Sequence, residues 1–134
     1  MVHHHLLPIN YTEQYSRQQR EVSLLLDAEA LMQCLITNGV KTVLHGHQHQ
    51  PYFTQIRRIV PCGVAGHEEF IDGTLNIIGS GSSGVSQASL NSIGRNTYQL
   101  LSLHDKRGEI QLKVKLRVRN SDGVGYIDGW DESL

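Results

Sequence analysis

The chain lacks several features that mark specialised classes of protein. Its 134 residues contain no apolar run long enough to span a bilayer and no secretory signal, so we expect a cytoplasmic protein without a membrane partner. The formal net charge is only −1, which does not indicate a nucleic-acid partner. The two cysteines, Cys34 and Cys62, are far apart and form no CxxC pair, so free thiols are expected. No G-x-S-x-G occurs, which leaves serine hydrolase chemistry without support.

The remaining composition is that of one globular domain over residues 1–134. Hydrophobic residues make up 39% and charged residues 19%, enough of each for an ordinary packed core and a hydrated surface. Histidine is the exception, because six of the eight histidines fall in two clusters, "HHH" at 3–5 and "HGHQH" at 45–49. The first cluster continues directly into the apolar "LLPI", so we interpret it as native sequence and not as a tag.

Local patterns predict an α/β or α+β fold with one main helix followed by mostly antiparallel strands. The helix is expected over 28–38, with Asp27 as N-cap, Gly39 as terminator and an apolar stripe of Ala28, Leu31, Met32 and Leu35. A short buried strand over 40–45 follows it. Further strands are predicted over 52–61, 74–79, 97–104 and 109–118, the last two as an antiparallel hairpin. The tail, 120–134, is rich in Gly and Asp, and Trp130 is expected to pack back on the body.

The two histidine clusters are each predicted to follow a strand. In an extended backbone, residues i and i+2 point to the same side, so His47 and His49 are expected to present two imidazoles to one point. A right-handed crossover through the helix would bring both strand ends to one edge of a sheet, where the clusters would meet. Imidazole nitrogen is a good ligand for Zn, Fe, Mn and Ni, so a metal site is the sharper interpretation, and an exposed polar loop is the plainer one.

The order strand–"HHH"–x–x–Pro, helix, strand–"GHQH" resembles the C-terminal half of a calcineurin-like metallophosphoesterase. The resemblance is clear over residues 2–51 and looser through "TLNIIGSGSSG" and the closing strands. It implies the C-terminal part of a four-layer αββα sandwich and a centre of two metal ions (Mn, Fe, Zn or Ni). It also implies that His47 and His49 are ligands, one to each metal. A third ligand would be His3 or His4, which the resemblance does not separate, while His5 and His45 would support the site.

The family's N-terminal motifs, which supply carboxylate and asparagine ligands, have no counterpart in this sequence. The resemblance therefore implies that the chain is the C-terminal part of a longer enzyme that hydrolyses phosphomonoesters or phosphodiesters. This part would be inactive until the N-terminal half, or another chain, completes the site. An incomplete sandwich would expose apolar surface and sheet edges, so self-association is also expected. The alternative is a non-catalytic module that binds metal or a protein.

Three weaker signals have plainer explanations. "GSGSSG" at 79–84 matches G-x-G-x-x-G, with Asp105 about twenty residues later, but the segment between them makes a poor helix for a dinucleotide site. The strand 113–119 alternates basic and apolar residues, which is more typical of a solvated sheet face than of a nucleic-acid contact. Residues 67–69, "HEE", with Cys62 nearby, lack the second ligand pair of a structural zinc site.

Overall fold

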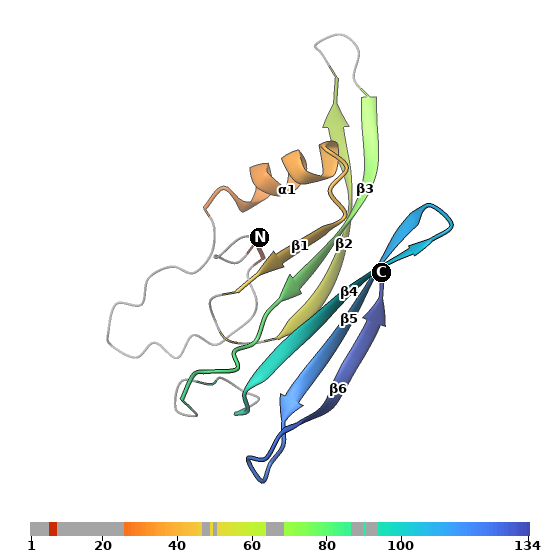
Figure 1. Ribbon diagram of the computed structural model, residues 1–134. Coiled ribbons are helices and arrows are strands. Elements are labelled where there is room, and N and C mark those ends of the chain that lie inside the picture. Colours follow the sequence, from red (N-terminus) through yellow and green to blue (C-terminus); the bar gives the residue numbers. More distant parts are fainter. Residues whose placement is uncertain are drawn as a thin grey trace, which may run out of the picture. The chain divides into compact units, whose positions relative to one another are not determined.

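The chain forms one helix and six strands within the residues that the structure, a computed structural model, describes: 6–7, 26–46, 49, 51–63, 69–86, 90 and 94–134. In chain order the elements are α1 (Ala28–Thr37), β1 (Thr42–His45), β2 (Tyr52–Cys62), β3 (Glu69–Gly79), β4 (Thr97–Lys106), β5 (Glu109–Arg119) and β6 (Tyr126–Ser133) (Figure 1). The strands make two three-stranded sheets, β1-β3-β2 and β4-β5-β6. At this level the predicted α+β class is confirmed.

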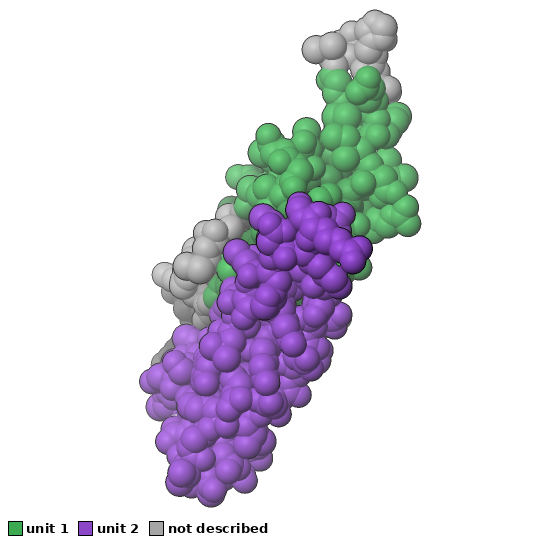
Figure 2. Space-filling view, turned by 45° about the vertical axis from the view of Figure 1, so that its right-hand side comes forward, with its two compact units in different colours: residues 1–47, 53–78 green, residues 48–52, 79–134 purple. Residues whose placement is uncertain are grey.

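The chain divides into two compact units, which Figure 2 shows in different colours. Unit 1 comprises residues 1–47 and 53–78, and unit 2 comprises residues 48–52 and 79–134. Among the residues described, no helix combines the length and the apolarity needed to cross a membrane. That the two units make up the single domain expected over 1–134 stays a prediction.

Helix α1 of unit 1 lies close to its predicted position. Gly39 ends it with a φ of 72°, a left-handed conformation that costs glycine little, and its N–H donates to the carbonyl of Ile36 at 3.0 Å. Asp27 takes the N-cap position, but its side chain makes no capping hydrogen bond. The buried face consists of Ala28, Met32 and Ile36. The predicted stripe was therefore wrong at its edge, because it included Leu31 and Leu35, which are half-buried, and omitted Ile36.

Sheet β1-β3-β2 provides the rest of the core of unit 1. Strands β1 and β3 run in the same direction and β2 runs in the opposite one (Figure 1). Burying a large aliphatic side chain contributes roughly 1.5–3 kcal/mol, so the buried aliphatic residues of this unit stabilise it. The aliphatic residues of unit 1 that are at most 5% exposed, apart from those of α1, are Leu6, Val43, Val60, Leu75, Ile77 and Ile78.

Sheet β4-β5-β6 of unit 2 is an antiparallel meander. The predicted hairpin is confirmed, and β4 pairs with β5 from Thr97 opposite Val118 to Lys106 opposite Glu109. Arg107 and Gly108 form the turn, with φ values of 60° and 84°, as a type I′ turn requires. The Gly108 N–H donates to Oδ1 of Asp105 at 2.9 Å, so this aspartate stabilises the turn.

Strand β6 corrects the sequence prediction, which gave the tail no strand. Trp130 lies opposite Leu116 of β5 and is half-buried. The β5–β6 register shifts between Leu116 and Arg117. A Cβ atom added at Gly129 would lie 2.7 Å from Cγ2 of Val118, so glycine allows the close approach of the strands at this irregularity. Gly129, one of the glycines of this Gly-rich tail, therefore permits a bulged strand.

Large apolar side chains are exposed near the β4–β5 turn. Leu103 and Ile110 are 71% and 76% exposed, and Leu100 is 49% exposed. Exposed apolar residues on a sheet are favourable sites for contact with another protein. The self-association expected from the sequence stays a prediction.

Candidate functional site

The segment predicted to bind metal begins where β1 ends, at His45. Three of the four predicted ligands, His3, His4 and His47, lie outside the described residues. The fourth, His49, is half-buried and has a φ of 57°. The sequence argument treated this segment as extended, and at His49 that is wrong, because a φ of 57° belongs to the left-handed region. The left-handed backbone of His49, and not the alternation of a strand, therefore sets the direction of this imidazole.

His45 is the most deeply buried histidine among the residues described, with 1% of its surface exposed. Its Nδ1 lies 3.3 Å from the carbonyl oxygen of Gly46, which accepts a hydrogen bond from the ring. Burial lowers the pKa of His45 below its ordinary value of 6.5, and the hydrogen bond to Gly46 opposes this shift. His45 is therefore a neutral imidazole at neutral pH and belongs to the packed end of β1.

Backbone hydrogen bonds hold the start of strand β1 against helix α1 and strand β3. Only residues 38–41 separate it from α1, and the Val40 N–H donates to the carbonyl of Leu35 at 2.9 Å, which fixes the turn between them. The Asn76 N–H donates to the carbonyl of Lys41 at 2.8 Å, which aligns the start of β1 with β3. The point at which the histidine segment leaves the sheet is thus set by a rigid helix–turn–strand unit.

Within the described part of the chain, no three His, Cys, Asp or Glu side chains are grouped as ligands of a metal ion. His67 and Glu68 lie outside the described residues, and Glu69 is an exposed residue at the start of β3. Neither Cys34, which is exposed, nor Cys62, which is half-buried, forms a disulfide. His49 is the one predicted ligand among the residues that the structure describes, and imidazole nitrogen suits Zn, Fe, Mn or Ni.

The glycine-rich segment is explained by packing within unit 2. A Cβ atom added at Gly79 would overlap the ring of Tyr52, and one added at Gly81 would overlap Oγ1 of Thr97. Glycine is needed at both positions because another residue lies against the backbone. Asp105, the candidate ribose ligand of the dinucleotide interpretation, accepts the turn hydrogen bond of Gly108. These observations disfavour a dinucleotide site.

Two of the four basic residues of β5, Lys115 and Arg117, are paired with β6. Asp128 forms ion pairs with Lys115, at 2.8 Å, and with Arg117. Arg117 also donates from Nη2 to the carbonyl of Tyr126 at 2.7 Å. The plainer interpretation therefore holds for these two cations, which stabilise the pairing of β5 with β6. Arg119, at the end of the same strand, has a different environment.

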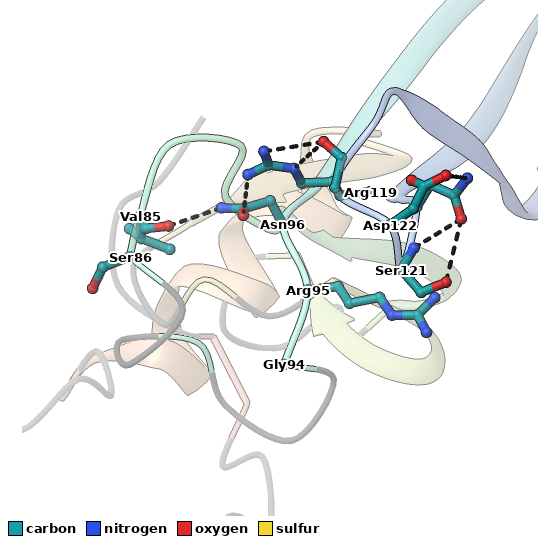
Figure 3. A pocket seen from close by; sticks show the side chains of 10 residues that line it. Val85, Ser86, Gly94, Arg95, Asn96, Arg119, Ser121 and Asp122 are labelled. Carbon is teal, nitrogen blue, oxygen red and sulfur yellow. Dashed lines mark hydrogen bonds between the residues drawn. The ribbon is translucent and has the colours of Figure 1, made fainter.

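Arg119 lines a pocket of about 600 Å³ in unit 2 (Figure 3). The walls come from the segment after β3, the start of β4 and the β5–β6 turn, and they include Arg95, Asn96 and Ser121. Sequence reasoning missed this pocket, because its residues are distributed over three loops. The available signal was an arginine at the end of a strand, followed by the "NSDG" turn.

Comparison of the chain with models of protein families, with curated proteins and with solved structures finds no match.

Proposed function

We propose that the chain supplies the C-terminal part of a metal-dependent phosphoesterase domain, a four-layer αββα sandwich that hydrolyses phosphomonoesters or phosphodiesters. The observation that carries the proposal is the placement of Gly-His-x-His directly after β1, with α1 leading into that strand through a four-residue connection. The resemblance to calcineurin-like metallophosphoesterases rests on the same order of elements and motifs.

The ligands proposed from this chain are His47, His49 and either His3 or His4. His49 is half-buried and follows the end of β1 by four residues, as the proposed motif requires. His45, the last residue of β1, is buried, and burial lowers its pKa, so it is neutral at neutral pH. A neutral buried group adds no positive charge that would repel a cation.

Divalent cations held by His47, His49 and His3 or His4 would supply Lewis-acid chemistry for the hydrolysis of a phosphoester. The histidines proposed here give neutral nitrogen donors. Carboxylate ligands would come from the N-terminal half or from another chain. The proposed role of this chain is thus to hold one side of the centre, and the substrate would be a phosphoester.

The proposal is tested by measuring the metal content of the chain after purification without metal-affinity chromatography. The wild type is compared with the double variant His47→Ala/His49→Ala and with His104→Ala. His104 is an exposed histidine of β4 in unit 2 and serves as the matched control. We expect bound Mn, Fe, Zn or Ni in the wild type and in the control, and loss of most of it in the double variant. Equal metal in all three proteins would refute the ligand assignment.

The catalytic part of the proposal needs a separate measurement. Hydrolysis of bis-p-nitrophenyl phosphate is measured on the product of the complete reading frame, with the same substitutions. Activity that depends on His47 and His49 but not on His104 supports the phosphoesterase. If metal binds at these histidines but the protein from the complete reading frame hydrolyses no substrate, the non-catalytic binding module is favoured.

A further inference from the structure

Strand β4 forms one edge of the sheet of unit 2, because β5 pairs with it on one side only (Figure 1). The Arg119 N–H donates to the carbonyl of Asn96 at 2.8 Å, which continues the β4–β5 pairing by one residue. The Thr97 N–H instead donates away from β5, to the carbonyl of Ser82, at 2.9 Å. The backbone groups of an antiparallel strand point alternately to its two sides, so every second residue after Thr97 directs its N–H and C=O outward. These outward residues are Gln99, Leu101, Leu103 and Asp105.

The outer side of residues 99–105 has no backbone partner in the part of the chain that the structure describes. Both limits of this free edge are fixed. The carbonyl of Ser82 occupies the edge at Thr97, and the turn at Arg107 and Gly108 follows the other end of β4. Ser102 therefore lies at the centre of the free edge.

The two edges of this sheet differ in their protection against another strand. Strand β6 carries Asp128, Asp131 and Glu132 among its eight residues, and its register with β5 is irregular. Charges and bulges are the means by which edge strands avoid pairing with another chain. Strand β4 pairs with β5 in an unbroken register, and residues 99–103 contain neither a charge nor a proline. A regular, uncharged edge of this kind is a template for a further strand.

The outward residues of β4 include two exposed leucines on one face of the sheet. Leu101 is 42% exposed and Leu103 is 71% exposed. They lie opposite Val114 and Leu112 of β5, and residues that lie opposite each other share a face. Val114 is completely buried, so the leucines extend an apolar surface from the middle of the sheet to its free edge. A strand added at this edge would place its own side chains next to them.

We propose that two copies of the chain associate by antiparallel pairing of β4 with β4, about a two-fold axis at Ser102. In this register Leu101 of each copy lies opposite Leu103 of the other, and Gln99 lies opposite Asp105. All of the outward residues then gain backbone partners, the leucines cover one another, and no charged residue faces another. A two-fold interface requires a surface that is complementary to itself, and this strand fulfils that requirement.

The neighbouring registers are less favourable. An axis at Leu103 would place the carboxylate of Asp105 opposite Leu101. An axis at Leu101 would require Asp105 to pair with Thr97, whose N–H is already bonded to Ser82. The proposal uses neither the histidines nor a metal, so it stands or fails independently of the phosphoesterase.

The first test is sedimentation equilibrium of the chain in EDTA, which removes metal bridges between copies. A single strand pair is a small interface, and small interfaces bind weakly, so the concentrations extend to about 1 mM. We expect a reversible dimer in the wild type. Leu103→Lys introduces the residue that commonly protects edge strands, and it should weaken dimerisation at least tenfold, about 1.4 kcal/mol.

Ile110→Lys is the matched control. Ile110 is 76% exposed and lies opposite Asp105, on the same face as the leucines, but it belongs to β5 and not to the edge. We expect this variant to dimerise as the wild type does. A monomeric wild type would overturn the proposal. Equal weakening by both substitutions would overturn it as well, because it would indicate that two sheet faces pack together.

The second test fixes the register by a disulfide, in the background Cys34→Ser/Cys62→Ser. Ser102 is exposed, and at the axis it would face its own copy as a non-hydrogen-bonded pair, with Cα atoms about 4.5 Å apart, which a disulfide can span. Ser102→Cys should therefore give a covalent dimer in oxidised glutathione. His104→Cys, also exposed, is the control, because its two copies would lie roughly 14 Å apart along the strands. Covalent dimers that form equally fast in both variants, or in neither, would overturn the pairing.

Discussion

The packing of α1 on sheet β1-β3-β2 depends on the absence of a side chain at Gly73. A Cβ atom added there would overlap Cγ2 of Ile36 and would lie 3.3 Å from its Cβ. Ile36 is only 4% exposed, so its side chain cannot turn out to solvent without leaving the core. Gly73→Ala must therefore push the helix away from β3 or force Ile36 from its rotamer.

The size of the effect follows from two opposed terms. Overpacking of a core costs roughly 1–3 kcal/mol. Replacing glycine by alanine inside a strand would otherwise stabilise by roughly 0.5–1 kcal/mol. We therefore expect Gly73→Ala to lower the free energy of unfolding of unit 1 by about 1 kcal/mol, which combines these two ranges.

The assay is urea unfolding followed by the NMR signals of α1, with Gly84→Ala as the matched control. A Cβ atom at Gly84 meets nothing within 4 Å, so this substitution should be neutral or stabilise by up to about 1 kcal/mol. Gly73→Ala that is as stable as the wild type would refute the packing argument. In the double variant with Ile36→Ala, the two changes should compensate by about 1 kcal/mol or more, and additivity within about 0.5 kcal/mol would contradict the contact.

Two further predictions concern unit 2. Gly81→Ala should destabilise the start of β4, because the new Cβ would overlap Oγ1 of Thr97 and lie 2.9 Å from the Cβ of Thr97. Faster amide hydrogen exchange at Thr97 would show this destabilisation, and unchanged exchange would contradict it. The hydrogen bond from Lys115 is the main cause that lowers the pKa of Asp128 in the folded protein. The ionised carboxylate therefore stabilises the fold at pH values above the pKa that Asp128 has in the unfolded chain. This stabilisation is lost as the pH falls through the lower pKa of the folded protein. Lys115→Gln should raise the pKa of Asp128 in a carboxyl NMR titration, and an unchanged midpoint would refute the assigned cause.

Much of the fold was predictable because its signals are local. The helix, with Gly39 after it, and the strand at 42–45 follow from apolar periodicity and from one glycine that needs a positive φ. The β4–β5 hairpin follows from alternation around "KRG", which carries its own turn chemistry. The strand at 126–133 was missed because Gly129 counts against a strand locally, and only the close approach of Val118 gives it a reason.

The sites were less predictable than the fold. The sequence identified the histidine segment, but the left-handed turn at His49 contradicts the extended geometry that was assumed for it. The pocket of unit 2 could not be found from local patterns. Asn96 lines it, and its Nδ2 donates to the carbonyls of Ser82 and Val85, which belong to a different segment of the chain. Arg95 and Arg119 are 24 positions apart, and both line the pocket because β4 pairs antiparallel with β5.

The strand orders of the two sheets imply different routes of folding. In β4-β5-β6 every strand pairs with its neighbour in sequence, and a two-residue turn closes the first hairpin. In β1-β3-β2 the strand β1 pairs with β3, although β2 lies between them in the sequence. A longer loop must therefore close before that pairing forms. Local pairing forms sooner than distant pairing. We therefore expect the meander to order first during refolding, and the strand that leads into the histidines to be fixed in a later step.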